Sequence, residues 1–189
     1  ALPELVQVAE WQNNRTDVHG QVKTMHTILT IINDEMAELG NTSPDIYWSV
    51  ENNSLGEAAL VVIQEMDEDK FPGTFLHEPK KKGRQRASRK GFTTTYKTKI
   101  TACMKMKSWI ESDKMTPLSK NFIRELKTFI AKGKSYEGKT GETDDLVSAT
   151  LLCVRQIQLI SRFEEGYEEL LGETLDSDVE YNDPLPIIF

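Results

Sequence analysis

The stretch Gly141-Glu142-Thr143-Asp144-Asp145-Leu146-Val147 places two adjacent carboxylates at the start of a long apolar segment. From Asp144 to Phe163 apolar residues fall on most sides of a helix, which indicates a helix that is largely buried. Thr143 is a favourable N-cap residue, and acids in a first turn are favoured by the helix dipole. The stretch therefore predicts a helix start, and leaves open whether its acids also have a chemical role.

The composition predicts a soluble globular chain. Its 189 residues, 38% hydrophobic and 28% charged, suit one domain, or one domain with an appendage. No apolar run approaches the roughly 18 residues of a membrane-spanning helix, and no signal-peptide pattern opens the chain. The sequence begins Ala1-Leu2-Pro3-Glu4, without an initiator Met, so we expect the chain to be an excised fragment. Cys103 and Cys153 lie in apolar helical patterns, so we expect both to be buried, in a reducing setting.

The net charge of −7 hides a strong asymmetry along the chain. Between Lys80 and Lys107 there are eleven Lys or Arg residues and no Asp or Glu. From Glu164 to Phe189 there are nine acids and no Lys or Arg. Because phosphate binding depends on the local field rather than on total charge, the basic segment is compatible with nucleic acid as a partner.

Periodicity predicts alternating strands and helices before the acid pair. We expect strands over 5–11, 46–50 and 74–77, helices over 19–39, 54–66 and about 95–110, a short helix over 117–125, and a hairpin over 126–130 and 135–137. This order indicates an α/β fold.

Glu51 directly follows the expected strand over 46–50 and directly precedes a helix start, which Ser54 and Glu57 mark as a capping box. In open α/β sheets, ligands bind at the carboxyl ends of strands, which favours a functional role. A solvated loop acid is the alternative.

A basic arm is expected over 79–91, and from Lys80 to Gly91 it has no apolar residue larger than Ala87, so it cannot pack into a core. Such a charge run is usually a solvated surface. The complete lack of acids favours an arm that faces phosphates.

Carboxylates at strand and helix ends beside a basic stripe suit divalent-metal chemistry on phosphodiesters. Mg²⁺ and Mn²⁺ prefer oxygen ligands, and a pair of such ions can activate a water and stabilise a leaving oxygen. Glu51, Asp144 and Asp145 are the candidate ligands. The pattern G-x-x-x-x-G-K-[ST] occurs once, over 133–140, but it falls within the expected hairpin and not between a strand and a helix, so it predicts no phosphate-binding loop. The chain contains no G-x-G-x-x-G motif, and no Ser/His/Asp constellation is indicated.

Several stretches resemble the nuclease domain of the large terminase subunit of tailed, T4-like bacteriophages. Glu51-Asn52-Asn53-Ser54-Leu55-Gly56 is similar to the second acidic motif of that family, and 141–147 to the third. Gly91-Phe92-Thr93-Thr94-Thr95, with the lysines that follow and Trp109-Ile110-Glu111-Ser112-Asp113-Lys114, resembles the segment after the basic hairpin. The end, Asp183-Pro184-Leu185-Pro186-Ile187-Ile188-Phe189, is similar to the C-terminal end of T4-like members.

The resemblance implies a ribonuclease H-like fold, a central mixed sheet flanked by helices, over residues 1–163, followed by an acidic tail over 164–189. The family carries its first catalytic Asp on the first strand of the sheet. Here the chain begins at what corresponds to the third strand, and Asp17 lies in a polar loop.

The implied activity is that of an endonuclease dependent on Mg²⁺ or Mn²⁺ that cuts concatemeric viral DNA during packaging, with Glu51, Asp144 and Asp145 as catalytic metal ligands. The resemblance also implies partners: double-stranded viral DNA, the terminase ATPase domain, the portal protein and the small terminase subunit, in the cytoplasm of the infected bacterial host. The residues expected to contact DNA are Lys80, Lys81, Lys82, Arg84, Arg86, Arg89, Lys90, Lys97 and Lys99.

Two other functions remain open. One is another ribonuclease H-like enzyme, such as a junction resolvase. The other is a non-catalytic module that binds DNA or docks on a motor.

Overall fold

The computed structural model describes residues 4–41, 45–53, 55–79, 90–133 and 135–175, and for 162–175 it describes the backbone alone. Six of the expected DNA-binding residues lie outside the described residues, namely Lys80, Lys81, Lys82, Arg84, Arg86 and Arg89. Ser54 and the C-terminal motif over 183–189 also lie outside them.

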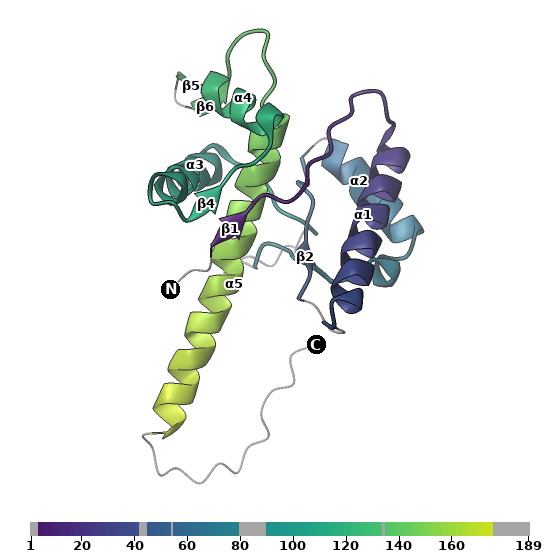
Figure 1. Cartoon of the computed structure of the whole chain (residues 1–189), viewed down its shortest axis with the longest axis vertical. Coiled ribbons are helices and arrows are strands. Elements are labelled where there is room, and N and C mark those ends of the chain that lie inside the picture. Colours follow the sequence, from purple (N-terminus) through teal and green to yellow (C-terminus); the bar gives the residue numbers. More distant parts are fainter. Residues whose placement is uncertain (1–3, 42–44, 54, 80–89, 134, 176–189) are drawn as a thin grey trace, which may run out of the picture. The chain divides into compact units, whose positions relative to one another are not determined.

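The described chain is a mixed α/β structure with five α-helices and small sheets (Figure 1). The helices are α1 (Val18–Glu38), α2 (Leu55–Glu65), α3 (Tyr96–Glu111), α4 (Lys120–Thr128) and α5 (Asp145–Leu175), with a short 3₁₀ helix, η1 (Glu68–Lys70). The strands are β1 (Leu5–Val6), β2 (Tyr47–Trp48), β3 (Thr74–Phe75), β4 (Met115–Thr116), β5 (Phe129–Lys132) and β6 (Ser135–Gly138).

The described strands form three separate pairs, so the expected central mixed sheet is not present as one sheet in this part of the chain. β1 pairs with β4 and β2 with β3, both in parallel, while β5 and β6 form the expected antiparallel hairpin. An isolated parallel bridge joins Glu51 to Phe92. The strand expected over 5–11 ends at Val6, and Val8 is 86% exposed. The alternating apolar residues after Val6 have neither a partner strand nor a buried face, and a stable strand needs both.

One apolar core lies between α1, α2 and the β2–β3 pair. Trp48 stacks on Phe75 with 4.2 Å between ring centroids, and α1 and α2 lie side by side over this pair (Figure 1). The buried members of the core are Val22, Leu29, Trp48, Ile63, Phe71 and Phe75. This core holds the end of β2, and therefore the backbone from which Glu51 projects.

The remaining long helices bury one face each. On α5 the buried residues Val147, Leu151 and Val154 recur at helical spacing. Cys103 of α3 is buried as expected, but Cys153 is exposed, which corrects the prediction for that residue. Cys153 falls off the face that Val147, Leu151 and Val154 define, although its neighbours in the sequence are apolar.

The chain divides into two compact units, residues 1–156 and 157–189, with the boundary inside α5. The helix that was expected to end near Phe163 continues to Leu175. In the part of the chain that the structure describes, no helix is both long enough and apolar enough to cross a membrane.

Candidate functional site

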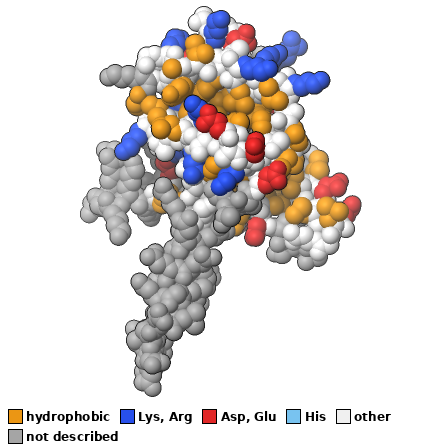
Figure 2. Space-filling view, turned by 60° about the vertical axis from the view of Figure 1, so that its left-hand side comes forward, with side chains coloured by type: hydrophobic (Ala, Val, Ile, Leu, Met, Phe, Trp, Pro, Cys, Tyr) orange, Lys and Arg blue, Asp and Glu red, His pale blue; other side chains and the backbone are white. Residues whose placement is uncertain are grey.

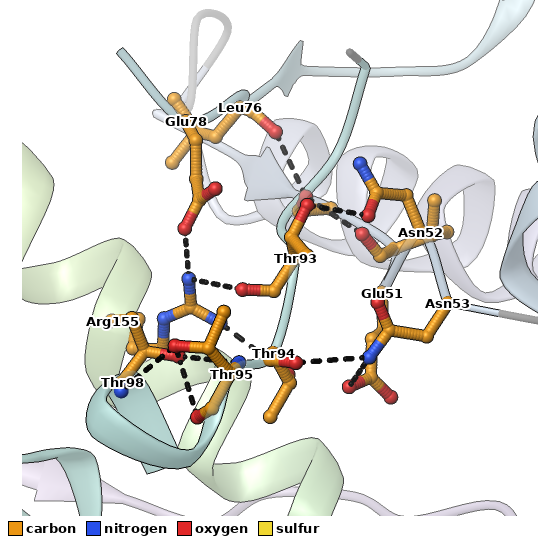
Figure 3. Close-up of polar contacts among 12 residues, drawn as sticks. Glu51, Asn52, Asn53, Leu76, Glu78, Thr93, Thr94, Thr95, Thr98 and Arg155 are labelled. Atoms are coloured by element: carbon orange, nitrogen blue, oxygen red, sulfur yellow. Dashed lines mark hydrogen bonds and ion pairs between the residues drawn. The ribbon is translucent and has the colours of Figure 1, made fainter. Parts of the chain in front are cut away.

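Glu51 lies just beyond the end of β2 and is held by its two asparagine neighbours (Figure 3). Asn53 Nδ2 donates to Glu51 Oε1 at 3.1 Å and to the carbonyl oxygen of Thr94 at 3.2 Å. Asn52 is buried, donates to the carbonyl oxygen of Lys90 at 2.8 Å and accepts from the Thr93 hydroxyl at 2.7 Å. The two asparagines therefore fasten the Glu51 segment to residues 90–94.

The first turn of α2 approaches the backbone of Glu51 very closely. A Cβ atom added at Gly56 would stand 1.4 Å from the carbonyl oxygen of Glu51. Only a residue without a side chain fits this contact, which explains the glycine in the stretch Glu51–Gly56.

Arg155 of α5 is the main basic neighbour of this segment (Figure 3). Its guanidinium donates to the Glu78 carboxylate, to the carbonyl oxygen of Thr93 at 3.2 Å and to the Thr94 hydroxyl at 3.4 Å. It also lies 5.0 Å from the centre of the Phe92 ring. Burial lowers the pKa of Arg155, while the nearby carboxylates of Glu78 and Glu51 act to raise it.

Sequence reasoning missed Arg155, although a signal was present. Between Leu146 and Ile160 it is the one charged residue of an apolar helix. A single cation on a buried helix usually has a carboxylate partner, and here the partner is Glu78.

The start of α5 is held by Glu125, a buried acid of α4 that the sequence did not single out. Its Oε2 accepts from the backbone N–H groups of Leu146 at 2.8 Å and Val147 at 3.2 Å. Its Oε1 accepts from the Thr143 hydroxyl at 2.8 Å and from Gln12 Nε2 at 3.2 Å. Glu125 thus fills the place at the helix N-terminus that Thr143 was expected to fill, and the Thr143 hydroxyl hydrogen-bonds to this carboxylate.

The two adjacent acids have different partners. The carboxylate of Asp144 forms an ion pair with Lys99 of α3, with 3.5 Å between Nζ and Oδ2. Asp145 is more exposed and accepts from Gln12 Nε2 at 3.2 Å. Lys99 also lies 5.5 Å from the centre of the Phe129 ring. Although Asp144 and Asp145 are adjacent in the sequence, their carboxylates therefore lie in different surroundings.

The basic residues expected to bind DNA are in part described. Lys90 pairs with Glu68, Lys97 is exposed, and Lys99 is occupied by Asp144. On the face drawn in Figure 2, Lys and Arg side chains lie around a patch of hydrophobic side chains, with some acidic side chains among them. Of the described lysines in the expected set, Lys97 is the one that forms no ion pair with another described residue.

The expected ligands do not meet at one point in the described residues. No group of three His, Cys, Asp or Glu side chains in this part of the chain is placed to hold a metal ion. Asp144 and Arg155, the neighbour of Glu51, are separated by three turns of α5, or about 16 Å of helix rise. Glu51, Asp144 and Asp145 offer oxygen atoms of the type that Mg²⁺ and Mn²⁺ prefer, but as they are placed they do not fit a two-ion centre.

Comparison with known proteins adds no assignment. No protein-family model matches this chain, and no curated protein matches it at a significant level.

Proposed function

We propose that this chain is the nuclease domain of a terminase large subunit of the T4-like type, a metal-dependent endonuclease with a ribonuclease H-like fold. Its substrate would be concatemeric double-stranded viral DNA. The proposal is supported by the motifs around Glu51 and Asp144 and by their positions, one after a strand of a parallel pair and one before a helix.

The observation that carries most weight is the contact between Lys99 and Asp144. The contact connects α3, the helix that follows the basic segment, to the acid pair. A nuclease needs its phosphate-binding residues close to its catalytic acids, so that the bound DNA lies beside them. Lys97, two residues earlier on α3, is exposed and is free to contact a phosphate.

When bound, Mg²⁺ or Mn²⁺ would supply an activated water and stabilise the leaving oxygen. Glu51, Asp144 and Asp145 are the ligands that we assign from the motifs. Because the described acids do not form one centre, we assign no reaction step to the ions. The roles that follow from the geometry are those of Asn53, which orients Glu51, and Glu125, which orients the start of α5.

The partners follow from the same proposal. They are the terminase ATPase domain, the portal protein and the small terminase subunit, and the place of action is the cytoplasm of the infected bacterium.

Cleavage of supercoiled plasmid in the presence of Mg²⁺ or Mn²⁺ tests the nuclease proposal. A chain extended at its N-terminus, where the resemblance implies the first catalytic Asp, should nick and linearise the plasmid. In that chain both Glu51→Gln and Asp144→Asn should reduce the rate at least ~100-fold, since a lost metal ligand costs several kcal/mol of transition-state stabilisation. Glu142→Gln, which removes an exposed acid two residues before Asp144, is the matched control and should cut normally. Absence of cutting, or equal cutting by either site variant, would refute the proposal.

A non-catalytic DNA-binding or motor-docking module is the second candidate. The observation in its favour is that Asp144 already forms an ion pair with Lys99, and that Arg155 lies near enough to Glu51 for their charges to interact. This candidate predicts DNA binding without cleavage. It also predicts no difference in thermal stability between Mg²⁺ and EDTA, whereas the nuclease proposal predicts stabilisation by the ion.

A further inference from the structure

A pocket of about 940 Å³ is lined by Asp145, and neither Asp144 nor Lys99 is among its lining residues. Its volume is in the range of sites that hold small organic ligands. Its wall combines an aromatic side chain, two arginines, several amides and the acid, among them Trp11, Asn13, Arg15, Arg124 and Asp145.

The segment that carries Trp11 and Arg15 is held in place by hydrogen bonds. Gln12 Nε2 donates both to Glu125 Oε1 and to Asp145 Oδ2, each at 3.2 Å. Asn13 Oδ1 accepts from the backbone N–H of Arg15 at 2.8 Å, which forms an Asx turn. The pocket wall is therefore already ordered, so a ligand would bind with little further loss of chain entropy.

The charges in this wall are not balanced. In the described residues neither Arg15 nor Arg124 forms an ion pair, and both are exposed. Among the described residues, Asp145 is the one acid that lines the pocket. Two unpaired guanidinium groups favour a ligand with phosphate groups, since their planar forks match phosphate oxygens.

The exposed aromatic side chain in the wall indicates a second property of the ligand, a flat ring that can stack. Trp11 is 41% exposed, while Trp48 and Trp109, the other two tryptophans of the chain, are 5% and 3% exposed. A large exposed ring beside arginines and amides is the combination by which proteins stack the bases of single strands and hold the backbone between them. In a duplex the faces of the bases are covered by their neighbours, so only an unpaired base can stack on this ring.

We propose that this pocket binds an unpaired nucleotide of a DNA strand next to the acid pair. The base stacks on Trp11, Arg15 and Arg124 contact the flanking phosphates, and the amide of Asn13 is within the same wall to contact the base edge. The choice of DNA as the ligand rests on the proposed nuclease function. The new element is that the site takes a locally single-stranded segment, with a subsite for one base.

Fluorescence quenching by a short oligothymidylate, in EDTA so that no cleavage occurs, tests this inference. Because Trp48 and Trp109 are buried, quenching by a stacked base reports on Trp11 even if the oligonucleotide also binds elsewhere. The full chain should show saturable quenching. The double variant Arg15→Ala and Arg124→Ala should reach half-saturation at a higher oligonucleotide concentration. The slope of log K against log salt concentration should also become smaller, by the equivalent of up to about two phosphate contacts.

Anisotropy with a labelled oligonucleotide measures the stacking itself. Trp11→Ala should weaken binding roughly 5- to 150-fold, the range expected for one stacked base, and Trp11→Phe should recover most of the loss. With an abasic oligonucleotide of equal length, Trp11→Ala should have no effect while the arginine variant still weakens binding. Lys127→Ala, an exposed cation of α4 that does not line the pocket, is the control.

Three results would overturn the inference: no quenching, binding that Trp11→Ala leaves unchanged, or equal quenching by a duplex of the same length. These outcomes are independent of plasmid cleavage. A chain that cuts plasmid but shows no quenching refutes the pocket alone, whereas quenching without cleavage refutes the nuclease proposal and leaves the pocket as a strand-binding site.

Discussion

Replacing Glu125 should destabilise the start of α5 more than any exposed substitution nearby. The side chain is 2% exposed, and its two oxygens accept hydrogen bonds from four donors. Two of those donors, the backbone N–H groups of Leu146 and Val147, belong to buried residues at a helix N-terminus. In Glu125→Ala they would have no acceptor.

The magnitude follows from those two buried bonds. A hydrogen bond to a charged group contributes about 1.5–3 kcal/mol, and a buried donor left unpaired carries its full desolvation penalty. The hydroxyl of Thr143 and the amide of Gln12 are accessible and would turn to water, so they add little. We expect Glu125→Ala to lower the free energy of unfolding by about 3–5 kcal/mol, a large part of the ~5–15 kcal/mol of a typical domain.

Glu125→Gln separates shape from charge. Its amide oxygen can still accept from Leu146 and Val147, but its NH₂ group would face the NH₂ group of Gln12, and the negative charge at the helix N-terminus is lost. The expected loss is about 1–2 kcal/mol.

Urea unfolding followed by circular dichroism measures these differences. The control is Glu142→Gln, an exposed acid in the loop before α5, which should change the free energy of unfolding by less than about 0.5 kcal/mol. If Glu125→Ala unfolds at the same urea concentration as the unaltered chain, with the same m-value, the assigned role of Glu125 is wrong.

Three further predictions concern the segment around Glu51. Burial lowers the pKa of His77 below its usual value of about 6.5, so as pH decreases the unfolded chain binds a proton there before the folded chain does. The His77 contribution to stability should fall as pH decreases from about 6.5, with a slope of at most ~1.4 kcal/mol per pH unit, and this fall should appear as the difference between the unaltered chain and His77→Gln; no such difference would contradict the assignment. Gly56→Ala should lower the free energy of unfolding by more than ~2 kcal/mol, because its methyl group would overlap the Glu51 carbonyl oxygen. The control is Gly40→Ala, whose methyl group would meet no atom within 4 Å and which should cost only the strain of the positive φ. Equal losses in the two variants would contradict this reasoning. Arg155→Met leaves the Glu78 carboxylate without its cation and should lower the thermal unfolding temperature by several degrees, while the double variant with Glu78→Gln should recover part of that loss; no recovery would mean that the pair is not coupled.

Much of the secondary structure was accessible from the sequence, because helical and strand periodicities are local. The helix expected over 19–39 is α1, Val18–Glu38. The hairpin expected over 126–130 and 135–137 is β5–β6, but its first strand begins only at Phe129, because α4 continues to Thr128. The helix after Thr93-Thr94-Thr95 begins at Tyr96 with Thr95 as its cap, one of the three choices offered by that stretch. Errors occurred where an element depends on a distant partner, as for the strand expected over 5–11.

Of the candidate site, the sequence indicated the acids but not their partners. The sequence predicts only that Glu125 ends a short helix. Its spacing of three residues from Phe122, which is also buried, was the available sign that this acid faces inward. Nothing local to Asp144 pointed to Lys99, which lies 45 residues earlier in the chain.

The sequence by itself determined the existence and approximate positions of the five described helices and the separation of basic and acidic segments, since each depends on neighbouring residues or on composition. Only the tertiary structure decided that Glu125 holds the start of α5, that Asp144 pairs with Lys99 while Asp145 faces a pocket, and that Arg155 stands near Glu51. The physical reason is that a charge takes its partner from whatever the packing of buried faces brings within about 4 Å, and that packing joins residues far apart in the chain.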